Sequence, residues 1–207
     1  MLAGKSIFIR GLAGSGKSTL IRGTLIPALE RAGKTVATIA LTHSAAFVAG
    51  GDTCAHFAWK HIRGGGTNVD VLWVDEVSML DLALLNDLNH LAYREPPLPL
   101  ILSGDFAQYG PFFNSFLGQP VQRSLRDSEL LLALAGGTRL TLTACRRSGK
   151  FLFDWYASLA DEPRGARFGM PLEQQVAEAR RDFAAPVGFA AATNLVISHR
   201  LREQLNA

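Results

Sequence analysis

Short apolar runs alternate with longer amphipathic stretches along the chain. Apolar runs bounded by polar or turn-forming residues predict buried strands over Ser6–Arg10, Thr35–Leu41, Val69–Asp75, Leu98–Ser103, Arg139–Thr143 and Leu195–Ser198. The first strand is followed by a predicted helix over Lys17–Ala32, which Gly33 ends. A second helix is predicted over Met79–Tyr93, capped by Ser78, with four leucines on one face: Leu80, Leu84, Leu88 and Leu91.

This alternation of strands and helices predicts an α/β fold, a parallel sheet with helices on both faces. Crossovers between parallel strands are right-handed, so the carboxyl ends of the strands gather at one edge of the sheet. Ligands of such folds bind at that edge, and residues that follow the strands are therefore the candidates for chemistry.

Composition excludes several classes of protein. With 48% hydrophobic and 19% charged residues, the chain is not disordered. No apolar run reaches the roughly 18 residues that cross a bilayer, and Met1–Arg10 lacks the pattern of a secretory signal. Cys54 and Cys145 are too few for a disulfide framework or a zinc site. We therefore expect a soluble intracellular protein without membrane contact.

Charge is distributed unevenly along the chain. Residues 1–70 hold eight Lys/Arg against three Asp/Glu, residues 71–140 four against eight, and residues 141–207 nine against seven. An acidic middle between basic flanks suits a metal–nucleotide centre beside basic surfaces. Ordinary solvated surface charge explains the same distribution equally well.

The residues Gly11–Ser18 match the phosphate-loop pattern G-x-x-x-x-G-K-[ST], between a predicted strand and a predicted helix. Such a loop wraps its backbone N–H groups around phosphates. Lys17 then reaches the β- and γ-phosphates, and the Ser18 hydroxyl is a ligand for Mg²⁺. The pattern predicts a nucleoside triphosphate site made of Gly11, Ala13, Gly14, Ser15, Gly16, Lys17 and Ser18.

Two further predicted strands end in polar residues. Asp75 and Glu76 follow an apolar run, where Asp75 would hold Mg²⁺ and Glu76 would polarise the attacking water. An acidic pair at a strand end can also be a solvated turn. After the next strand, Gln108 can reach towards a γ-phosphate and sense its departure, although this stretch read alone is an ordinary polar turn.

Together these elements resemble the motor core of superfamily 1B helicases, the RecD-like and PIF-type group that moves 5′ to 3′. Asp75–Met79 is similar to the group's D-E-x-S-M motif, and Gly104–Gln108 to its G-D-x-x-Q motif. The resemblance implies a RecA-like P-loop NTPase that uses ATP and Mg²⁺. Its implied activity is ATP hydrolysis coupled to movement on single-stranded nucleic acid, with DNA favoured over RNA.

The resemblance also implies a surface for the single strand. Thr42–Ala46 resembles the segment that contacts the strand's backbone, and Gly50–Phe57 is similar to a G-G-x-T-x-H-x-F run. Ala55 stands at the histidine position of that run, and His56 follows it. The implied nucleic-acid residues are Thr42, His43, Thr53, His56 and Phe57, joined by Lys60, His61 and Arg63 as basic or aromatic neighbours. Trp59 and Trp73 are predicted to be core residues.

A last element, Leu142–Arg147, resembles the family's L-T-x-x-F-R-Q, whose arginine reaches the γ-phosphate. Arg146 takes that role by position, while Cys145 and Arg147 depart from the pattern. We expect residues 1–160 to form the motor domain, and 161–207 a connecting segment and the opening of a second motor domain. Since little of that domain fits in the chain, we expect either a truncated or degenerate helicase or a protein partner that supplies the missing domain.

Two other functions fit the same nucleotide motifs. A small-molecule phosphotransferase such as a nucleoside kinase also uses a phosphate loop and an acidic strand end, and would need an arginine-rich lid. The arginines available for one are Arg164, Arg167, Arg180 and Arg181. Such a kinase assigns no role to the Ser78-Met79 pair or to Gln108. A nucleotide-binding accessory module without catalysis is the third interpretation.

Overall fold

The structure is a computed structural model that describes residues 4–62, 66–108, 110–111, 114–121, 125–126, 128–160 and 165–184. The chain divides into two compact units, Met1–Ala166 and Arg167–Ala207. The strand predicted over Leu195–Ser198 and the expected opening of a second motor domain lie outside the described residues.

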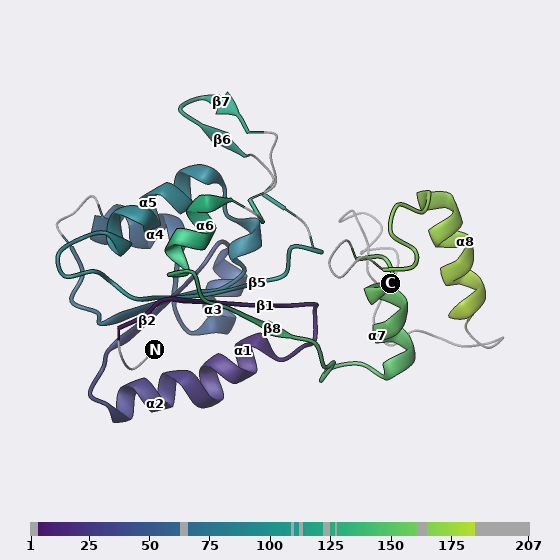
Figure 1. Cartoon of the computed structure of the whole chain (residues 1–207), viewed down its shortest axis with the longest axis horizontal. Coiled ribbons are helices and arrows are strands. Elements are labelled where there is room, and N and C mark those ends of the chain that lie inside the picture. The colour runs from purple at the N-terminus through teal and green to yellow at the C-terminus, as the bar shows by residue number, and fades with distance from the viewer. Residues whose placement is uncertain are drawn as a thin grey trace, which may run out of the picture. The chain divides into compact units, whose positions relative to one another are not determined.

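Unit 1 is built on a six-stranded sheet in which every pair of neighbouring strands is parallel (Figure 1). The strand order is β3-β2-β4-β5-β1-β8. The strands are β1 (Ile7–Gly11), β2 (Val36–Ala40), β3 (Asp52–Thr53), β4 (Val71–Val74), β5 (Leu100–Gly104) and β8 (Arg139–Leu142). The parallel α/β architecture is confirmed, and β3 is the one strand of this sheet that the apolar pattern did not predict.

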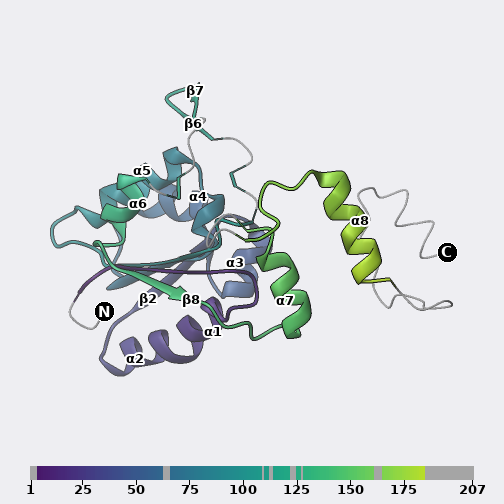
Figure 2. The same cartoon turned by 45° about the vertical axis from the view of Figure 1, so that its right-hand side comes forward.

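Helices cover both faces of this sheet, as Figures 1 and 2 show from two directions. One face carries α1 (Lys17–Leu20), a π-helical turn (Ile21–Leu25) and α2 (Ile26–Arg31), which run on as the single helix predicted from the sequence. The opposite face carries α4 (Cys54–Phe57), α5 (Leu82–Ala92) and α6 (Glu129–Leu134). The remaining elements of unit 1 are α3 (His43–Ala49), a π-helical turn (Ala58–Ile62), a 3₁₀ turn (Val77–Met79), the hairpin β6 (Ser115–Phe116) and β7 (Gln119–Pro120), and α7 (Lys150–Ala157).

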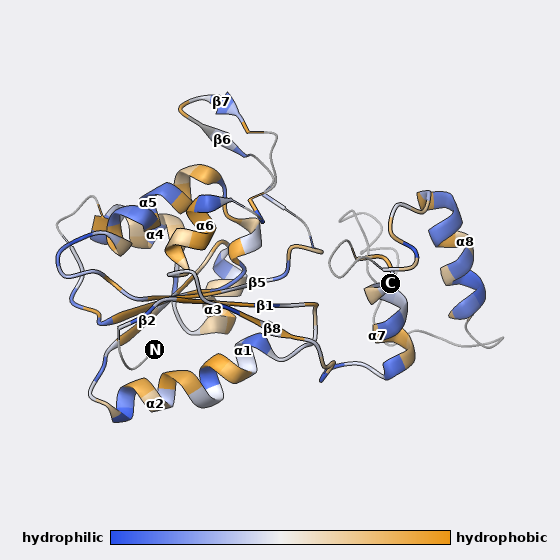
Figure 3. Cartoon of the chain, viewed as in Figure 1, coloured by the Kyte–Doolittle hydropathy of each residue, from blue (hydrophilic) through white to orange (hydrophobic). Residues whose placement is uncertain are grey.

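Each face of the sheet buries its own apolar cluster. On the α1–α2 face, Ile9, Trp73 and Ile101 pack with Ile21 and Leu29. On the other face, strand residues pack with the leucines of α5 and α6 and with Phe57 of α4. The strands at the centre of the sheet are coloured as hydrophobic in Figure 3, as strands buried on both faces must be. Trp73 is fully buried, which confirms its predicted place in the core.

The helix after β4 begins later than predicted. Ser78 lies buried in the 3₁₀ turn, and Leu80 follows with extended dihedral angles. Asp81 is the N-cap of α5, since its carboxylate accepts a hydrogen bond of 2.8 Å from the N–H of Leu84. The prediction that Ser78 caps this helix is therefore wrong. The intervening turn lets Leu80 enter the core from outside the helix.

The described part of unit 2 contains α8 (Leu172–Asp182). Arg167 Nε donates to Glu178 Oε2 at 2.7 Å and so ties the preceding turn to this helix. Throughout the described part of the chain, every helix is too short or too polar to span a membrane.

Candidate nucleotide site and nucleic-acid surface

The phosphate loop connects the carboxyl end of β1 to the first turn of α1. Gly14 and Gly16 have φ angles of 77° and 88°, a left-handed conformation that glycine adopts without strain. The N–H of Ser15 donates to the carbonyl of Leu12 at 3.1 Å and closes the turn. The sequence adopts this loop because glycine stands at both left-handed positions.

Lys17 begins α1 and turns back over the loop. Its Nζ donates to the carbonyls of Gly11 at 2.7 Å and Leu12 at 3.3 Å, and the residue is only 8% exposed. Burial lowers the pKa of Lys17, and the nearby carboxylates of Asp105, Glu76 and Asp75 oppose that shift. The ammonium group thus stands among three acidic side chains at the sheet edge.

Asp75, directly after β4, meets the phosphate loop. Ser18 Oγ donates to Asp75 Oδ2 at 3.2 Å, so the two predicted Mg²⁺ ligands face each other across 57 residues of sequence. Asp75 Oδ1 accepts from Ser103 Oγ at 2.7 Å and from the N–H of Glu76 at 3.1 Å. Both carboxylate oxygens are therefore oriented by hydrogen bonds.

Ser103 was missed by the sequence analysis. This fully buried serine of β5 accepts a hydrogen bond of 2.8 Å from Trp73 Nε1 and donates to Asp75. The signal in the sequence was a serine directly after the apolar run Leu100–Leu102, on the strand next to the one that carries Trp73. The indole of Trp73 thus orients the hydroxyl of Ser103, and this hydroxyl orients the carboxylate of Asp75.

Glu76 lies beside Asp75 in a left-handed conformation, with φ of 54°. Burial raises the pKa of its carboxyl group, and the neighbouring Asp75 raises it further. Its Oε2 is buried and accepts no hydrogen bond from the described residues. A buried carboxylate with a raised pKa and an uncommitted oxygen has the properties of a general base.

The third strand end brings Asp105 and Gln108 to the same edge. Asp105 is 4% exposed, and its carboxylate accepts from the N–H of Ala107 at 2.9 Å and from Gln108 Nε2 at 3.1 Å. Gln108 is exposed and held towards Asp105. The electrostatic effect of Asp105 on Lys17 was not predicted from the sequence.

Two arginines follow β8 and border the phosphate loop. The N–H of Arg146 donates to the carbonyl of Gly14 at 2.7 Å, and a Cβ on Gly16 would lie 3.5 Å from Arg146 Cγ. Arg147 acts electrostatically on Lys17 and Glu76, lowering the pKa of both. The structure thus brings the backbone of Arg146 to the loop and adds Arg147, while contact of the Arg146 side chain with a γ-phosphate stays a prediction.

The residues of this edge fit a magnesium–nucleotide complex. Ser15 Oγ and Glu76 Oε2 are buried polar atoms with no hydrogen-bond partner among the described residues. Mg²⁺ is commonly held by one or two protein oxygens together with substrate phosphates, and Ser18 and Asp75 offer that pair. The described residues contain no group of three or more acidic, His or Cys side chains that would bind a metal without phosphates.

The residues predicted to contact a single strand differ in their exposure and in their local role. Thr42 and Thr53 are N-caps: Thr42 Oγ1 accepts from the N–H of Ala45 at 3.1 Å, and Thr53 Oγ1 from that of His56 at 3.2 Å. Thr53 is buried, whereas Thr42, His43 and His56 are exposed. His56 Nδ1 lies 3.3 Å from Asp52 Oδ1.

The aromatic residues of this surface differ from the prediction. Phe57 is 3% exposed and packs in the core, so it is not available to a base. Trp59, expected in the core, is 68% exposed and stacks on His56 with ring centroids 6.5 Å apart. The π-helical turn that begins at Ala58 follows α4 directly. In this arrangement Phe57 packs in the core and Trp59 is exposed to solvent.

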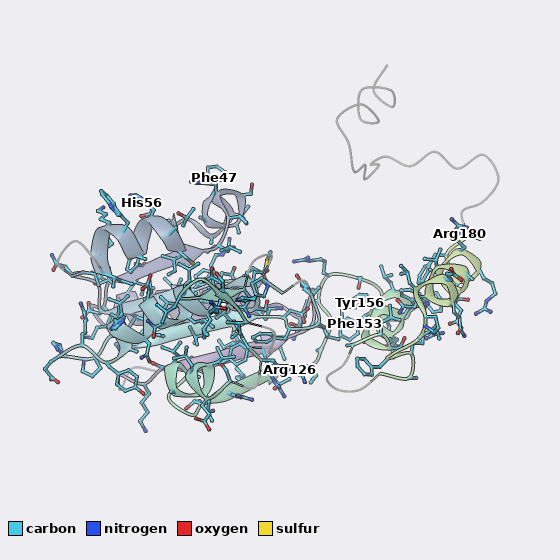
Figure 4. All side chains as sticks on the ribbon, turned by 90° about the horizontal axis from the view of Figure 1, so that it is seen from above. Phe47, His56, Arg126, Phe153, Tyr156 and Arg180 are labelled. Atoms are coloured by element: carbon cyan, nitrogen blue, oxygen red, sulfur yellow. The ribbon has the colours of Figure 1, made fainter. Side chains whose placement is uncertain are left out.

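Phe47 of α3 was missed and is 86% exposed. Figure 4 shows Phe47 and His56 projecting from the same side of the molecule. We call Thr42, His43, Phe47, His56, Trp59 and Lys60 the α3–α4 surface. His61 is partly buried against Phe57, and Arg63 lies outside the described residues.

Comparison with known proteins shows which family this chain belongs to. A family model described as an AAA domain matches residues 3–120, more than half of the chain, including the phosphate loop, the acidic pair and Gln108. The chain belongs to this family. An ATP-dependent DNA helicase PIF1 of Candida albicans is 34% identical over 136 residues, which cover 54% of this chain and 15% of that relative. PIF5 of Trypanosoma brucei is 33% identical over 135 residues, covering 53% of this chain and 14% of the relative.

Solved structures agree on the fold of this AAA-family chain. The Pif1 helicase of Candida albicans has a TM-score of 0.63 at 23% identity, covering 99% of this chain and 50% of that one. Bacteroides Pif1 bound to ssDNA has a TM-score of 0.55 at 18% identity, covering 86% and 46%. The resemblance to a superfamily 1B, PIF-type motor domain is confirmed. The chain spans about one-seventh of the length of the curated relatives it matches.

Proposed function

We propose that this chain is the ATP-binding and ATP-hydrolysing motor core of a PIF-type helicase and acts on single-stranded DNA with 5′–3′ polarity. The observation that carries the proposal is the meeting of Ser18 Oγ and Asp75 Oδ2 at 3.2 Å, with Glu76 beside them. Two motifs far apart in sequence thereby form one edge suited to a metal–triphosphate complex. The names of the PIF1 and PIF5 relatives support the helicase class.

Each residue of the edge has a distinct part in this chemistry. The loop N–H groups and Lys17 bind the phosphates, and Ser18 with Asp75 would hold Mg²⁺, which neutralises phosphate charge when bound. Glu76 accepts the proton of the attacking water. Gln108, which donates to Asp105, and Arg146, which lies beside Gly16, are the proposed contacts of the departing γ-phosphate. Hydrolysis rather than transfer to a hydroxyl is favoured because a kinase would assign no role to the Ser78-Met79 pair or to Gln108.

The α3–α4 surface is the proposed binding site of the single strand. Exposed aromatic rings stack on bases, and neighbouring basic groups attract the phosphate backbone. Phe47 and Trp59 supply the rings, and Lys60 supplies charge. A Pif1 of Bacteroides, similar in fold, is described as bound to ssDNA.

For the 207-residue chain assayed alone, we propose slow hydrolysis and no duplex unwinding. In the resembled motors a second domain closes over ATP and adds an arginine, commonly worth about 10³–10⁵ in rate. The described residues of this edge offer Arg146 and Arg147. A partner chain or a longer form of the protein would complete it.

The test measures MgATP binding and turnover with and without oligo-dT. DNA-stimulated hydrolysis supports the motor, turnover only with an added nucleoside supports a kinase, and binding without turnover supports an accessory module. Lys17→Ala should abolish turnover, at a cost of about 10²–10³ or more in rate. Lys5→Ala, which changes an exposed lysine outside the site, is the matched control.

A further inference from the structure

The turn and helix after β8 hold the outside of the phosphate loop. Tyr156 of α7 donates from its hydroxyl to the carbonyl of Ala13 at 2.7 Å, across 143 residues of sequence. The N–H of Arg146 donates to the next carbonyl, that of Gly14, at 2.7 Å. Two successive carbonyls of the loop are therefore held from the same side. The nucleotide motifs give Tyr156 no role.

Holding these carbonyls also orients the N–H groups that follow them. A peptide unit is planar and trans, so a carbonyl that points outward directs the following N–H the opposite way. Fixing the carbonyl of Ala13 orients the N–H of Gly14, which belongs to the loop that cradles phosphates. Fixing the carbonyl of Gly14 orients the N–H of Ser15, which donates to the carbonyl of Leu12 at 3.1 Å and closes the turn.

The contact is close and specific. A Cβ on Gly14 would lie 2.9 Å from Arg147 Cβ and 3.6 Å from Tyr156 Oη, so this segment packs directly on the loop. The Tyr156 ring packs edge-on against Phe153 with centroids 5.2 Å apart, and Figure 4 shows the two rings side by side on α7. Burial raises the pKa of Tyr156, which keeps the hydroxyl protonated as a donor.

Elsewhere α7 meets the sheet loosely. A cavity of about 380 Å³ lies between Phe153 and Ala157 of α7 and the strand ends at Leu12, Phe106 and Leu142. No residue of α7 is buried. The residues of α7 are half-buried or exposed, so the hydrogen bond from Tyr156 is a discrete link between α7 and the loop.

We propose that Tyr156 is a positioning residue that holds the phosphate loop in its anion-binding conformation and links the loop to α7. The predicted effect on nucleotide affinity rests on the proposed function. The effect on the loop itself does not, because the hydrogen bond exists within the chain alone.

The first test compares amide hydrogen exchange of residues 12–16 without nucleotide in wild-type chain and Tyr156→Phe. This variant removes the hydroxyl and keeps the ring on Phe153. We expect exchange of the loop to be about two- to tenfold faster, the effect of losing one hydrogen bond. Exchange of β4 should be unchanged. Tyr93→Phe, at a tyrosine that is 69% exposed, is the matched control.

The second test measures the MgATP dissociation constant and the fluorescence of Trp155, the neighbour of Tyr156 on α7, with Trp155→Phe assigning the signal. Tyr156→Phe should weaken binding about two- to tenfold and reduce the fluorescence change on binding, while Tm stays near that of wild type.

The two tests separate the two proposals. Unchanged loop exchange in Tyr156→Phe, or a lowered Tm with exchange raised equally in the loop and in β4, overturns the positioning role. If wild type binds no nucleotide, the proposed function fails, and the exchange of residues 12–16 still decides the role of Tyr156.

Discussion

The nucleotide edge and the α3–α4 surface are built in opposite ways. At the nucleotide edge, Lys17, Asp75 and Asp105 are each less than a tenth exposed, and hydrogen bonds orient them before any ligand binds. On the α3–α4 surface, Phe47 and Trp59 are mostly exposed, and Trp59 stacks on His56. One region is preorganised by burial, and the other presents rings to solvent.

This difference indicates what each region can do. Buried, oriented charges act on one ligand geometry, which suits a reaction at a phosphate. Exposed rings and basic groups tolerate many base sequences, which suits a strand that must move. Substitutions at the edge should therefore change chemistry by large factors, and substitutions on the surface should change affinity by smaller ones.

The largest expected effect is the loss of hydrolysis in Glu76→Gln. The amide still fits the buried position but does not accept a proton, so turnover should fall by about 10²–10⁴. MgATP affinity should stay near that of wild type, because Asp75 and the loop are unchanged. Single-turnover hydrolysis and a binding titration measure both quantities. Glu30→Gln, at an exposed glutamate of α2, is the control.

The comparison of Asp75 with Glu76 tests whether the two carboxylates of the nucleotide edge have separate roles. Asp75→Asn should weaken the Mg²⁺ dependence of binding, whereas Glu76→Gln should not. Equal loss of MgATP binding in the two variants would show that the roles are misassigned.

A second prediction compares Phe57 with Trp59. Phe57→Ala removes a core ring and should cost about 3–5 kcal/mol of unfolding free energy. Trp59→Ala should leave the fold nearly unchanged and weaken binding of oligo-dT by about 1–3 kcal/mol, the worth of stacking on one base. Urea unfolding and fluorescence anisotropy measure these changes. DNA affinity that survives Trp59→Ala would remove this surface from the proposed path of the strand.

The sequence predicted the nucleotide edge far better than the surface. The phosphate loop and Asp75-Glu76 lie directly after apolar strands, and parallel topology brings such ends together whatever the rest of the chain does. Phe57 and Trp59 lie within a short helix and a π-helical turn, and their exposure depends on how that segment packs against α5. That packing is a tertiary property, so both were placed wrongly from the sequence.

Ser103 was missed for a related reason. Its role needs Trp73 on the neighbouring strand and Asp75 beyond it, in a register that the sequence alone does not specify. Asp81 was likewise passed over for Ser78, because a 3₁₀ turn delays the helix by a few residues.

The third prediction tests Ser103 as the support of the edge. Ser103→Ala leaves the buried Trp73 Nε1 without its acceptor and should cost about 1–3 kcal/mol of stability. It also removes the shorter of the two hydrogen bonds that Asp75 Oδ1 accepts, so the concentration of Mg²⁺ needed for nucleotide binding should rise. Ser44→Ala, at an exposed serine of α3, should change neither quantity. Unchanged stability of Ser103→Ala in urea would show that the Trp73–Ser103–Asp75 connection is dispensable.

The smallest expected effect concerns the pH dependence of stability. Burial first, and Asp75 second, raise the pKa of Glu76 above its ordinary value of 4.5. The folded chain therefore binds this proton more tightly than the unfolded chain, and stability is lost as pH rises from the ordinary value through the raised one. Glu76→Gln removes that loss, so the variant should have the higher Tm at neutral pH. The difference in Tm between Glu76→Gln and wild type should shrink as the pH is lowered towards about 5.

Thermal unfolding without nucleotide measures this difference in Tm, with Glu30→Gln expected to follow wild type at every pH. A Tm of Glu76→Gln at or below that of wild type at neutral pH would mean that the carboxylate is well solvated. The edge would then be less strongly preorganised by burial than its contrast with the α3–α4 surface requires.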